Sequence, residues 1–203
     1  QRPCILVSST FTPKLSLAHS DAFIAELKRL MELDKYDWMI TMHPLMDKDC
    51  ADKFRALEKT NVKFKDTTDL IPLFKQADLM IADTTSAIAE FLLQEKPVVT
   101  FNNNKPDNHL IDIQQPEQLE AAIQKGLACP AELMAYIKQF IAETHPYNDG
   151  QSSARVIDAC VNFLRKDKQH LKSKPLNLLR KLQIRKKYKF FSLRSYTKPI
   201  TLK

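Results

Sequence analysis

The sequence predicts a Rossmann-like, doubly wound parallel α/β fold, and two observations predict it. Short apolar segments alternate with longer segments whose apolar residues recur at helical spacing, as in a parallel sheet covered by helices on both faces. Polar, hydroxyl-rich residues follow several of the apolar segments, which is typical of the ligand-binding edge of such a sheet. The 203 residues suffice for one domain of this kind and an appendage.

Five segments are predicted to be strands, because each is a short apolar run bounded by polar or turn-forming residues. The run Cys4-Ile-Leu-Val ends at small polar residues, and a second run ends directly before His43 and Pro44. The predicted strands are Pro3 to Ser8, Asp37 to Met42, Val62 to Phe64, Leu79 to Ala82 and Pro97 to Phe101.

Helices are predicted between and after these strands. In the first of them, the apolar residues from Phe23 to Met31 recur at helical spacing, and Ser20 precedes them as a favourable N-cap. The predicted helices are Ala22 to Leu33, Lys48 to Glu58, a helix capped by Asp69 that runs through Gln76, Thr84 or Thr85 to Gln94, Pro116 to Lys125, Pro130 to Glu143 and Ser152 to Leu164.

Four polar segments are expected to meet at one edge of the sheet, because ligands of open parallel sheets bind outside the carboxyl ends of the strands. These segments are Ser8 to Thr10, His43-Pro44, Asp66 to Thr68 and Asp83 to Ser86. Ser9 and Thr10 are accordingly candidate ligand-binding residues at this edge, and the family resemblance given below makes the expected ligand a nucleotide diphosphate. This shared edge is the strongest functional signal in the residue pattern.

Thr84, Thr85 and Ser86 are predicted to bind phosphate, because unpaired N–H groups and the positive end of the helix dipole gather where a strand becomes a helix. The chain has only two glycines, Gly126 and Gly150, so it contains neither a dinucleotide fingerprint nor a Walker motif. The alternative is that the three hydroxyl residues simply cap the helix.

His43 and Glu90 are the two further candidates for this site. The proline after His43 holds that residue extended, so its imidazole can donate to a phosphate or act as a general base. Glu90 follows Ser86 by one helical turn and can accept both hydroxyls of a ribose. Each has an alternative: His43 as a structural hydrogen-bonding group, and Glu90 as a solvated helix residue.

Composition and cysteine usage narrow the class of protein. Hydrophobic residues make up 44% and charged residues 27%, and no apolar run approaches the length of a bilayer span. The four cysteines, Cys4, Cys50, Cys129 and Cys160, lack metal-ligand or redox spacing, so we expect reduced thiols in a cytosolic protein and no metal site. The chain begins at Gln1 without a signal peptide, and we expect it to be a piece of a longer protein.

Five segments together resemble the C-terminal domain of the CDP-glycerol glycerophosphotransferases, which build teichoic-acid-like polymers and have the two-domain GT-B architecture. They are Ile5 to Pro13, Met42-His43-Pro44, Ala77 to Phe91, Lys96 to Val99 and His145 to Val156. The resemblance covers about residues 3 to 164 in the family's order. It implies that the fold is the C-terminal half of a GT-B enzyme, with the acceptor site and the general base on an N-terminal domain.

The resemblance also implies roles for individual residues. His43, with Thr85 and Ser86, would grip the diphosphate of the donor, and Glu90 would stand at the family's usual aspartate. The family commonly has Asp-Tyr-Ser-Ser where this chain has Asp83-Thr84-Thr85-Ser86, so Thr85 would replace a serine. A glutamate at position 90 is also similar to UDP-N-acetylglucosamine 2-epimerases, and this leaves the base of the donor open.

The charge is divided along the chain. Arg165 to Lys203 contains 14 Lys and Arg and one acid, whereas residues 1 to 164 contain 17 bases and 23 acids. We therefore predict a domain at 1–164 and a basic, partly helical tail at 165–203. Basic residues interleaved with Leu and aromatic residues suit an anionic membrane surface. The bases expected there are Arg180, Lys181, Arg185, Lys186 and Lys187, and a solvated tail without a partner is the alternative.

These observations favour the donor-binding domain of a CDP-glycerol-type glycerophosphotransferase, peripheral on the cytoplasmic face of the cell membrane. His43, Thr85 and Ser86 would stabilise the departing cytidine nucleotide, with His43 the one candidate catalytic residue, and no cofactor is expected beyond the donor itself. Two alternatives remain: a glycosyltransferase or epimerase-like enzyme using a CMP- or UDP-sugar, and a non-catalytic nucleotide-binding or membrane-docking module. Nucleic acid is not expected as a partner, because the globule is acidic.

Overall fold

The computed structural model describes residues 2–167, 171–172 and 175–189. The chain divides into a first unit, Gln1–Asp149, and a second unit, Gly150–Lys203. The first unit ends before the domain boundary predicted after residue 164, so the helix expected at Ser152 to Leu164 belongs to the second unit. That residues 1–164 form one domain stays a prediction.

The first unit is built on a six-stranded sheet of order β3-β2-β1-β4-β5-β6, in which every pair of neighbours is parallel. The predicted doubly wound α/β fold is therefore confirmed. All five predicted strands are present to within a residue. The strands are β1 Cys4–Ser9, β2 Asp37–Met42, β3 Val62–Phe64, β4 Leu79–Ala82, β5 Val98–Phe101 and β6 Ile111–Ile113.

The sixth strand was missed because it is short and carries a charge in its middle. Asp112 lies between two buried isoleucines of β6, so the segment is not an apolar run. Its Oδ1 accepts hydrogen bonds from the Thr100 hydroxyl at 2.7 Å and from the Asn103 N–H at 3.0 Å. These two hydrogen bonds stabilise Asp112 in the edge strand β6, where the sequence pattern did not predict a strand.

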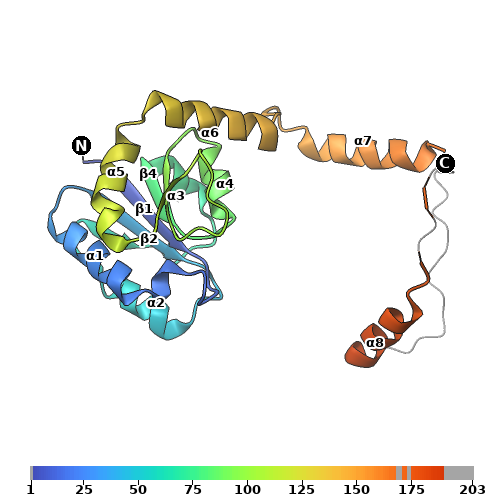
Figure 1. Ribbon diagram of the computed structural model, residues 1–203, viewed down its shortest axis with the longest axis horizontal. Coiled ribbons are helices and arrows are strands. Elements are labelled where there is room, and N and C mark those ends of the chain that lie inside the picture. Colours follow the sequence, from blue (N-terminus) through green and yellow to red (C-terminus); the bar gives the residue numbers. More distant parts are fainter. Residues whose placement is uncertain (1, 168–170, 173–174, 190–203) are drawn as a thin grey trace. The chain divides into compact units, whose positions relative to one another are not determined.

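Helices cover both faces of this sheet (Figure 1), with α1, α2 and α5 on one side and α3 and α4 on the other. The bounds differ from prediction in four places: α2 ends at Arg55 instead of Glu58, α3 and α4 are shorter than expected, and the helix predicted from Pro116 begins as the 3-10 turn η2. A further 3-10 turn precedes α1. The helices of the first unit are η1 Leu17–His19, α1 Asp21–Glu32, α2 Lys48–Arg55, α3 Ile71–Gln76, α4 Ala87–Leu92, η2 Pro116–Gln118, α5 Leu119–Leu127 and α6 Ala131–Thr144.

The core lies on both sides of β1 and β4, whose central residues are fully buried. On one face the ring of Phe23 from α1 packs 4.4 Å from that of Phe101, and on the other Phe74 meets Phe91 edge-on at 5.6 Å. Burial of each such side chain contributes about 1.5–3 kcal/mol. At Gly126 a Cβ atom would lie 2.5 Å from Leu79 Cδ1, so glycine allows α5 to approach β4 closely.

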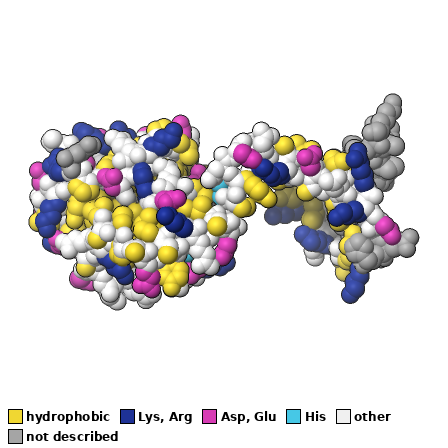
Figure 2. Space-filling model, turned by 90° about the horizontal axis from the view of Figure 1, so that it is seen from above, with side chains coloured by type: hydrophobic (Ala, Val, Ile, Leu, Met, Phe, Trp, Pro, Cys, Tyr) yellow, Lys and Arg dark blue, Asp and Glu magenta, His cyan; other side chains and the backbone are white. Residues whose placement is uncertain are grey.

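The second unit contains two helices, α7 Ser152–Arg165 and α8 Leu178–Tyr188, and neither has a buried residue within the described part of the chain. Helix α8 confirms that the basic tail is partly helical. Lys and Arg side chains gather over this unit (Figure 2). Among the described residues, no helix combines the length and the apolar content that crossing a bilayer requires.

Candidate functional site

A cavity of about 200 Å³ opens at the carboxyl ends of the first strands of the sheet. All four predicted polar segments contribute to it, because β3, β2, β1 and β4 are consecutive in the sheet and their following loops leave from the same edge. The lining residues are Ser8, Ser9, Thr41, Met42, His43, Pro44, Thr67, Thr68, Leu70, Thr85, Ser86, Ala87 and Glu90.

His43 lies directly after β2 with its ring half-buried against Phe11, the two ring centroids being 4.5 Å apart. The backbone N–H of Leu45 donates to His43 Nδ1 at 3.0 Å. Because Nδ1 accepts this bond, the neutral imidazole carries its proton on Nε2. The ring is therefore held by Phe11 and Leu45, and its second nitrogen is the group that can donate to a ligand.

Thr85, Ser86 and Glu90 line the same cavity and come from the turn after β4 and the start of α4. The helix begins at Ala87, later than predicted, and Ser86 is its N-cap without a side-chain capping bond. The Ala87 N–H donates instead to Thr85 Oγ1 at 3.3 Å. Glu90 is exposed although its neighbours Phe91 and Leu92 are fully buried, so its carboxylate remains accessible from the cavity side.

Ser9 and Thr10 are tied to a buried carboxylate. Asp83 is fully buried and accepts hydrogen bonds from Ser9 Oγ at 2.6 Å, from the Thr10 N–H at 3.0 Å and from the Leu17 N–H at 3.0 Å. Burial raises the pKa of Asp83, and the hydrogen bonds oppose that shift. The Ser9 hydroxyl and the Thr10 N–H thus join the loop after β1 to the end of β4. Ser9 lines the cavity and Thr10 does not, and a ligand-binding role for either residue stays a prediction.

Thr84 precedes the cavity residue Thr85, and its hydroxyl contacts the loop after β5. Its Oγ1 accepts the Asn104 N–H at 3.1 Å, and Asn103 Nδ2 donates to the Asp83 carbonyl at 2.8 Å. These bonds connect the turn after β4 to the loop after β5. Thr84 is not among the residues that line the cavity, whereas Thr85 and Ser86 are.

Thr41 is a cavity residue that sequence reasoning missed. It is 2% exposed, and its Oγ1 has no hydrogen-bond partner within the described part of the chain. Thr41 pairs in register with Ser8 of β1, so the two hydroxyl residues lie side by side on one face of the sheet. A buried hydroxyl without a partner is costly, and this one borders a cavity. The sequence did contain a signal for this site residue, because Thr41 is the one polar residue in the apolar run before His43.

A larger cavity, of about 630 Å³, lies at the opposite edge of the sheet, where Cys4, Asp78 and Lys96 contribute to its wall. The Lys96 ammonium group there already donates to the carbonyl oxygens of Phe74 at 2.8 Å, Lys75 at 3.0 Å and Ala77 at 2.6 Å. The Lys96 ammonium group therefore caps the carbonyl groups at the end of α3. We favour the smaller cavity because its polar groups include unpartnered ones.

The four cysteines form no disulfide in the described structure. Sequence spacing gave no reason to expect a metal site, but the fold brings Cys50 together with Asp47 and His19, whose ligand atoms lie within 4.8 Å of one another. Asp47 and Cys50 are three residues apart at the start of α2, and His19 comes from η1. The missed signal was this Asp-x-x-Cys spacing at a helix N-terminus.

The five bases proposed to face a membrane all lie on α8 and are exposed. The apolar residues of α8 do not share one face: Leu178, Leu179 and Leu182 lie within one side, whereas Ile184 lies on the opposite side, given 3.6 residues per turn. The basic character of this helix is therefore stronger than its amphipathic character.

Comparison with known proteins places this geometry among transferases. The family model described as CDP-glycerol:poly(glycerophosphate) glycerophosphotransferase matches residues 5–107. A comparison with curated proteins gave no match. Among solved structures, the wall teichoic acid polymerase TagF is similar with a TM-score of 0.57 and 14% identity, over 81% of this chain and 44% of that one.

Two further solved structures are similar in fold. One is described as a UDP-N-acetylglucosamine 2-epimerase from Listeria monocytogenes, with a TM-score of 0.56, 16% identity and coverage of 82% of this chain and 46% of that one. The other is S. aureus MnaA with UDP, with a TM-score of 0.58, 13% identity and coverage of 80% and 46%. The chain thus spans less than half the length of each of these three solved structures.

Proposed function

Because the chain belongs to the CDP-glycerol:poly(glycerophosphate) glycerophosphotransferase family, we propose that its first unit is the donor-binding half of an enzyme that makes teichoic-acid-like polymer. The observation that carries the proposal is the cavity that joins His43 to Thr85, Ser86 and Glu90. Its volume of about 200 Å³ is below the 300–1,000 Å³ usual for ligand sites. This supports a half-cleft that a second domain completes.

In the proposed reaction an acceptor hydroxyl attacks the glycerol-bearing phosphorus of CDP-glycerol. The new P–O bond forms as the bond to the CMP oxygen breaks, and the acceptor proton passes to a base on the second domain. His43 Nε2–H and the hydroxyls of Thr85 and Ser86 donate to the departing nucleotide phosphate, on which negative charge develops. No covalent intermediate with this chain is required, and we propose no cofactor.

Glu90 is proposed to hold the ribose. Glu90 follows Ser86 by four residues at the start of α4, so both lie on one side of the helix. A nucleotide whose phosphate meets Ser86 would place its sugar hydroxyls toward the Glu90 carboxylate, which can accept two hydrogen bonds.

The Thr41 hydroxyl supports a ligand in the same place. Its buried oxygen lacks a protein partner among the described residues, and an oxygen or N–H group of the donor would supply one. The proposal therefore explains a polar side chain that the protein fold alone leaves unsatisfied.

The test is calorimetric titration of CDP, CMP, UDP and UMP into the full chain and its His43→Ala variant. We expect the cytidine nucleotides to bind more tightly and His43→Ala to weaken CDP binding at least about tenfold, the effect of one hydrogen bond to a charged group. His145→Ala, outside the cavity at the end of α6, is the matched control and should bind as the unchanged protein does. Absence of nucleotide binding by the unchanged chain would contradict the proposal.

A uridine donor is the second candidate, because the proposed contact between Glu90 and the ribose fits a uridine nucleotide equally well. A ribose contact does not distinguish cytosine from uracil, and one structure of similar fold contains UDP. Tighter binding of UDP than of CDP in the same titration would shift the proposal to an enzyme that uses a UDP-sugar.

We also propose that α8 binds an anionic membrane surface, which would bring the enzyme beside a lipid-linked acceptor. Five of the eleven residues of α8 are Lys or Arg and none is acidic, and each base near such a surface contributes about 1 kcal/mol. Replacing all five with Gln in the full chain should abolish flotation with phosphatidylserine liposomes. Five Lys→Gln changes in the first unit are the control, and equal flotation of both variants would contradict this part of the proposal.

A further inference from the structure

A second group of reactive side chains lies where η1 meets the start of α2, outside the proposed nucleotide cavity. His19 Nε2 is 3.2 Å from Asp47 Oδ2, and the ligand atoms of His19, Asp47 and Cys50 all lie within 4.8 Å of one another. Ligand atoms of a tetrahedral zinc ion are roughly 3.3–3.8 Å apart, given bonds of about 2.0–2.3 Å. The three side chains therefore need only small shifts to share one ion.

Local structure holds these ligands in place. Asp47 is the N-cap of α2, and its Oδ1 accepts the Cys50 N–H at 2.8 Å, which leaves Oδ2 to face His19. Cys50 is 5% exposed, and its thiol donates to the carbonyl of Ala18, the residue before His19, at 3.0 Å. A capped helix and a buried thiol thus position the trio, and hydrogen-bonded carboxylates of this kind are common among metal ligands.

We propose that His19, Asp47 and Cys50 form a binding site for a divalent transition metal ion, with zinc the best match. Imidazole nitrogen, carboxylate oxygen and thiolate sulfur are the ligand types that zinc prefers. Binding replaces the Cys50 thiol proton, which is released to solvent, and exchanges the thiol bond to Ala18 for a metal–sulfur bond. Three protein ligands leave the fourth tetrahedral position to water.

The site would join two segments that follow neighbouring strands. Residues 17–19 come after β1, and α2 comes after β2 and His43. A metal ion shared between them would join the segment that follows Ser9 to the segment that follows His43, and both Ser9 and His43 line the proposed nucleotide cavity. This inference does not rest on the proposed function, because metal binding is measured without any nucleotide.

Cobalt titration of the reduced, tag-free full chain tests the site. We expect one Co²⁺ per chain with a thiolate-to-cobalt charge-transfer absorption, displaced by one equivalent of Zn²⁺. Cys50→Ser keeps a donor for the Ala18 carbonyl and should abolish the absorption. Asp47→Asn keeps a favourable N-cap and should weaken binding at least about tenfold, as His19→Gln should.

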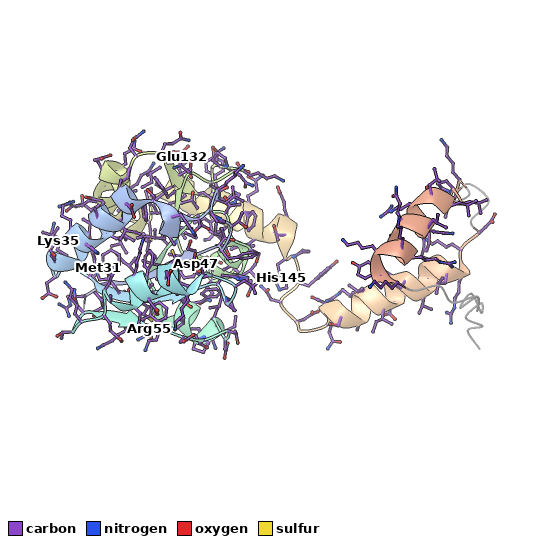
Figure 3. The ribbon with its side chains drawn as sticks, turned by 90° about the horizontal axis from the view of Figure 1, so that it is seen from below. Met31, Lys35, Asp47, Arg55, Glu132 and His145 are labelled. Atoms are coloured by element: carbon purple, nitrogen blue, oxygen red, sulfur yellow. The ribbon has the colours of Figure 1, made fainter. Side chains whose placement is uncertain are left out.

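Matched controls come from residues elsewhere. Cys129→Ser removes an exposed thiol, and His145→Gln removes a histidine that Figure 3 shows beyond the end of α6, away from Asp47 at α2. Both should bind cobalt as the unchanged chain does. Zinc should raise the unfolding temperature of the unchanged chain and not of Cys50→Ser. Failure to bind one metal ion per chain, or a charge-transfer band that survives Cys50→Ser, overturns the proposal.

Discussion

The two units of the chain differ in charge and in burial. The first contains 16 bases and 22 acids, and its central strands are fully buried. The second contains 15 bases and 2 acids, and its helices bury no residue in the described structure. Helices in proteins are stabilised mainly by packing of an apolar face. The first unit is therefore stabilised by its own buried core, whereas the helices of the second unit expose their charged and apolar side chains.

The apolar residues of α7 and α8 are arranged differently. In α7 Val156, Ile157, Cys160, Val161 and Leu164 fall within one side of the helix, opposite Arg155 and Asp158, given 3.6 residues per turn. Val156 is 63% exposed and Ile157 62%. The apolar face of α7 and the basic surface of α8 are therefore different surfaces, and only the second was expected from the sequence.

The largest expected effect compares one leucine from each unit. Leu27→Ala in α1 removes a fully buried side chain and should lower the free energy of unfolding by about 2–5 kcal/mol. Leu179→Ala in α8 removes a side chain that is 80% exposed and should change it by less than about 0.5 kcal/mol. Urea unfolding measures both, and equal losses would break the distinction between the units.

A smaller effect is expected at Asp83. In Asp83→Asn the amide NH₂ must face a buried N–H donor of Thr10 or Leu17, which leaves a donor unsatisfied and should cost about 1–3 kcal/mol. Asp158→Asn, exposed on α7, is the matched change in the second unit and should be near neutral. A neutral result at Asp83 would mean that the loop after β1 does not depend on its carboxylate.

At Thr41 we expect opposite changes in stability and in binding. Valine has the shape of threonine without the unpartnered hydroxyl, so Thr41→Val should raise the free energy of unfolding by about 1 kcal/mol. If the cavity binds nucleotide, the same change should weaken CDP binding roughly fivefold to tenfold. Thr60→Val, at an exposed position, is the control. Unchanged CDP affinity in Thr41→Val would contradict a contact between Thr41 and the nucleotide, but it would not contradict nucleotide binding in this cavity.

The smallest expected effect is a difference in pH dependence. Burial raises the pKa of Asp83 above its ordinary value of 3.8, so the folded state binds this proton more tightly than the unfolded state. The stability due to the proton is present below pH 3.8 and is lost as pH rises through the folded pKa. Asp83→Asn should lack this loss, and the two proteins should converge in unfolding free energy as pH rises. A difference in unfolding free energy between the two proteins that stays constant across the pH series would contradict this prediction.

Most of the fold followed from local patterns, because each of the five predicted strands is a short apolar run with polar ends. The start of α4 was placed too early because Thr84 and Thr85 both precede the helix: the Thr84 hydroxyl accepts the Asn104 N–H, and the Thr85 hydroxyl accepts the N–H of Ala87, the first helical residue. The carboxyl-end rule brought His43 and Ser86 to one cavity. It did not predict the bonds of Ser9 and Thr10 to Asp83, because these join residues more than 70 positions apart in the chain.

The bonds at Asp83 have a consequence for how a ligand would enter. The loop after β1 is fastened at Ser9, Thr10 and Leu17 before any ligand arrives, so little backbone must be ordered on binding and the entropy lost should be small. Recognition at this wall of the cavity would then resemble docking to a rigid template more than induced fit.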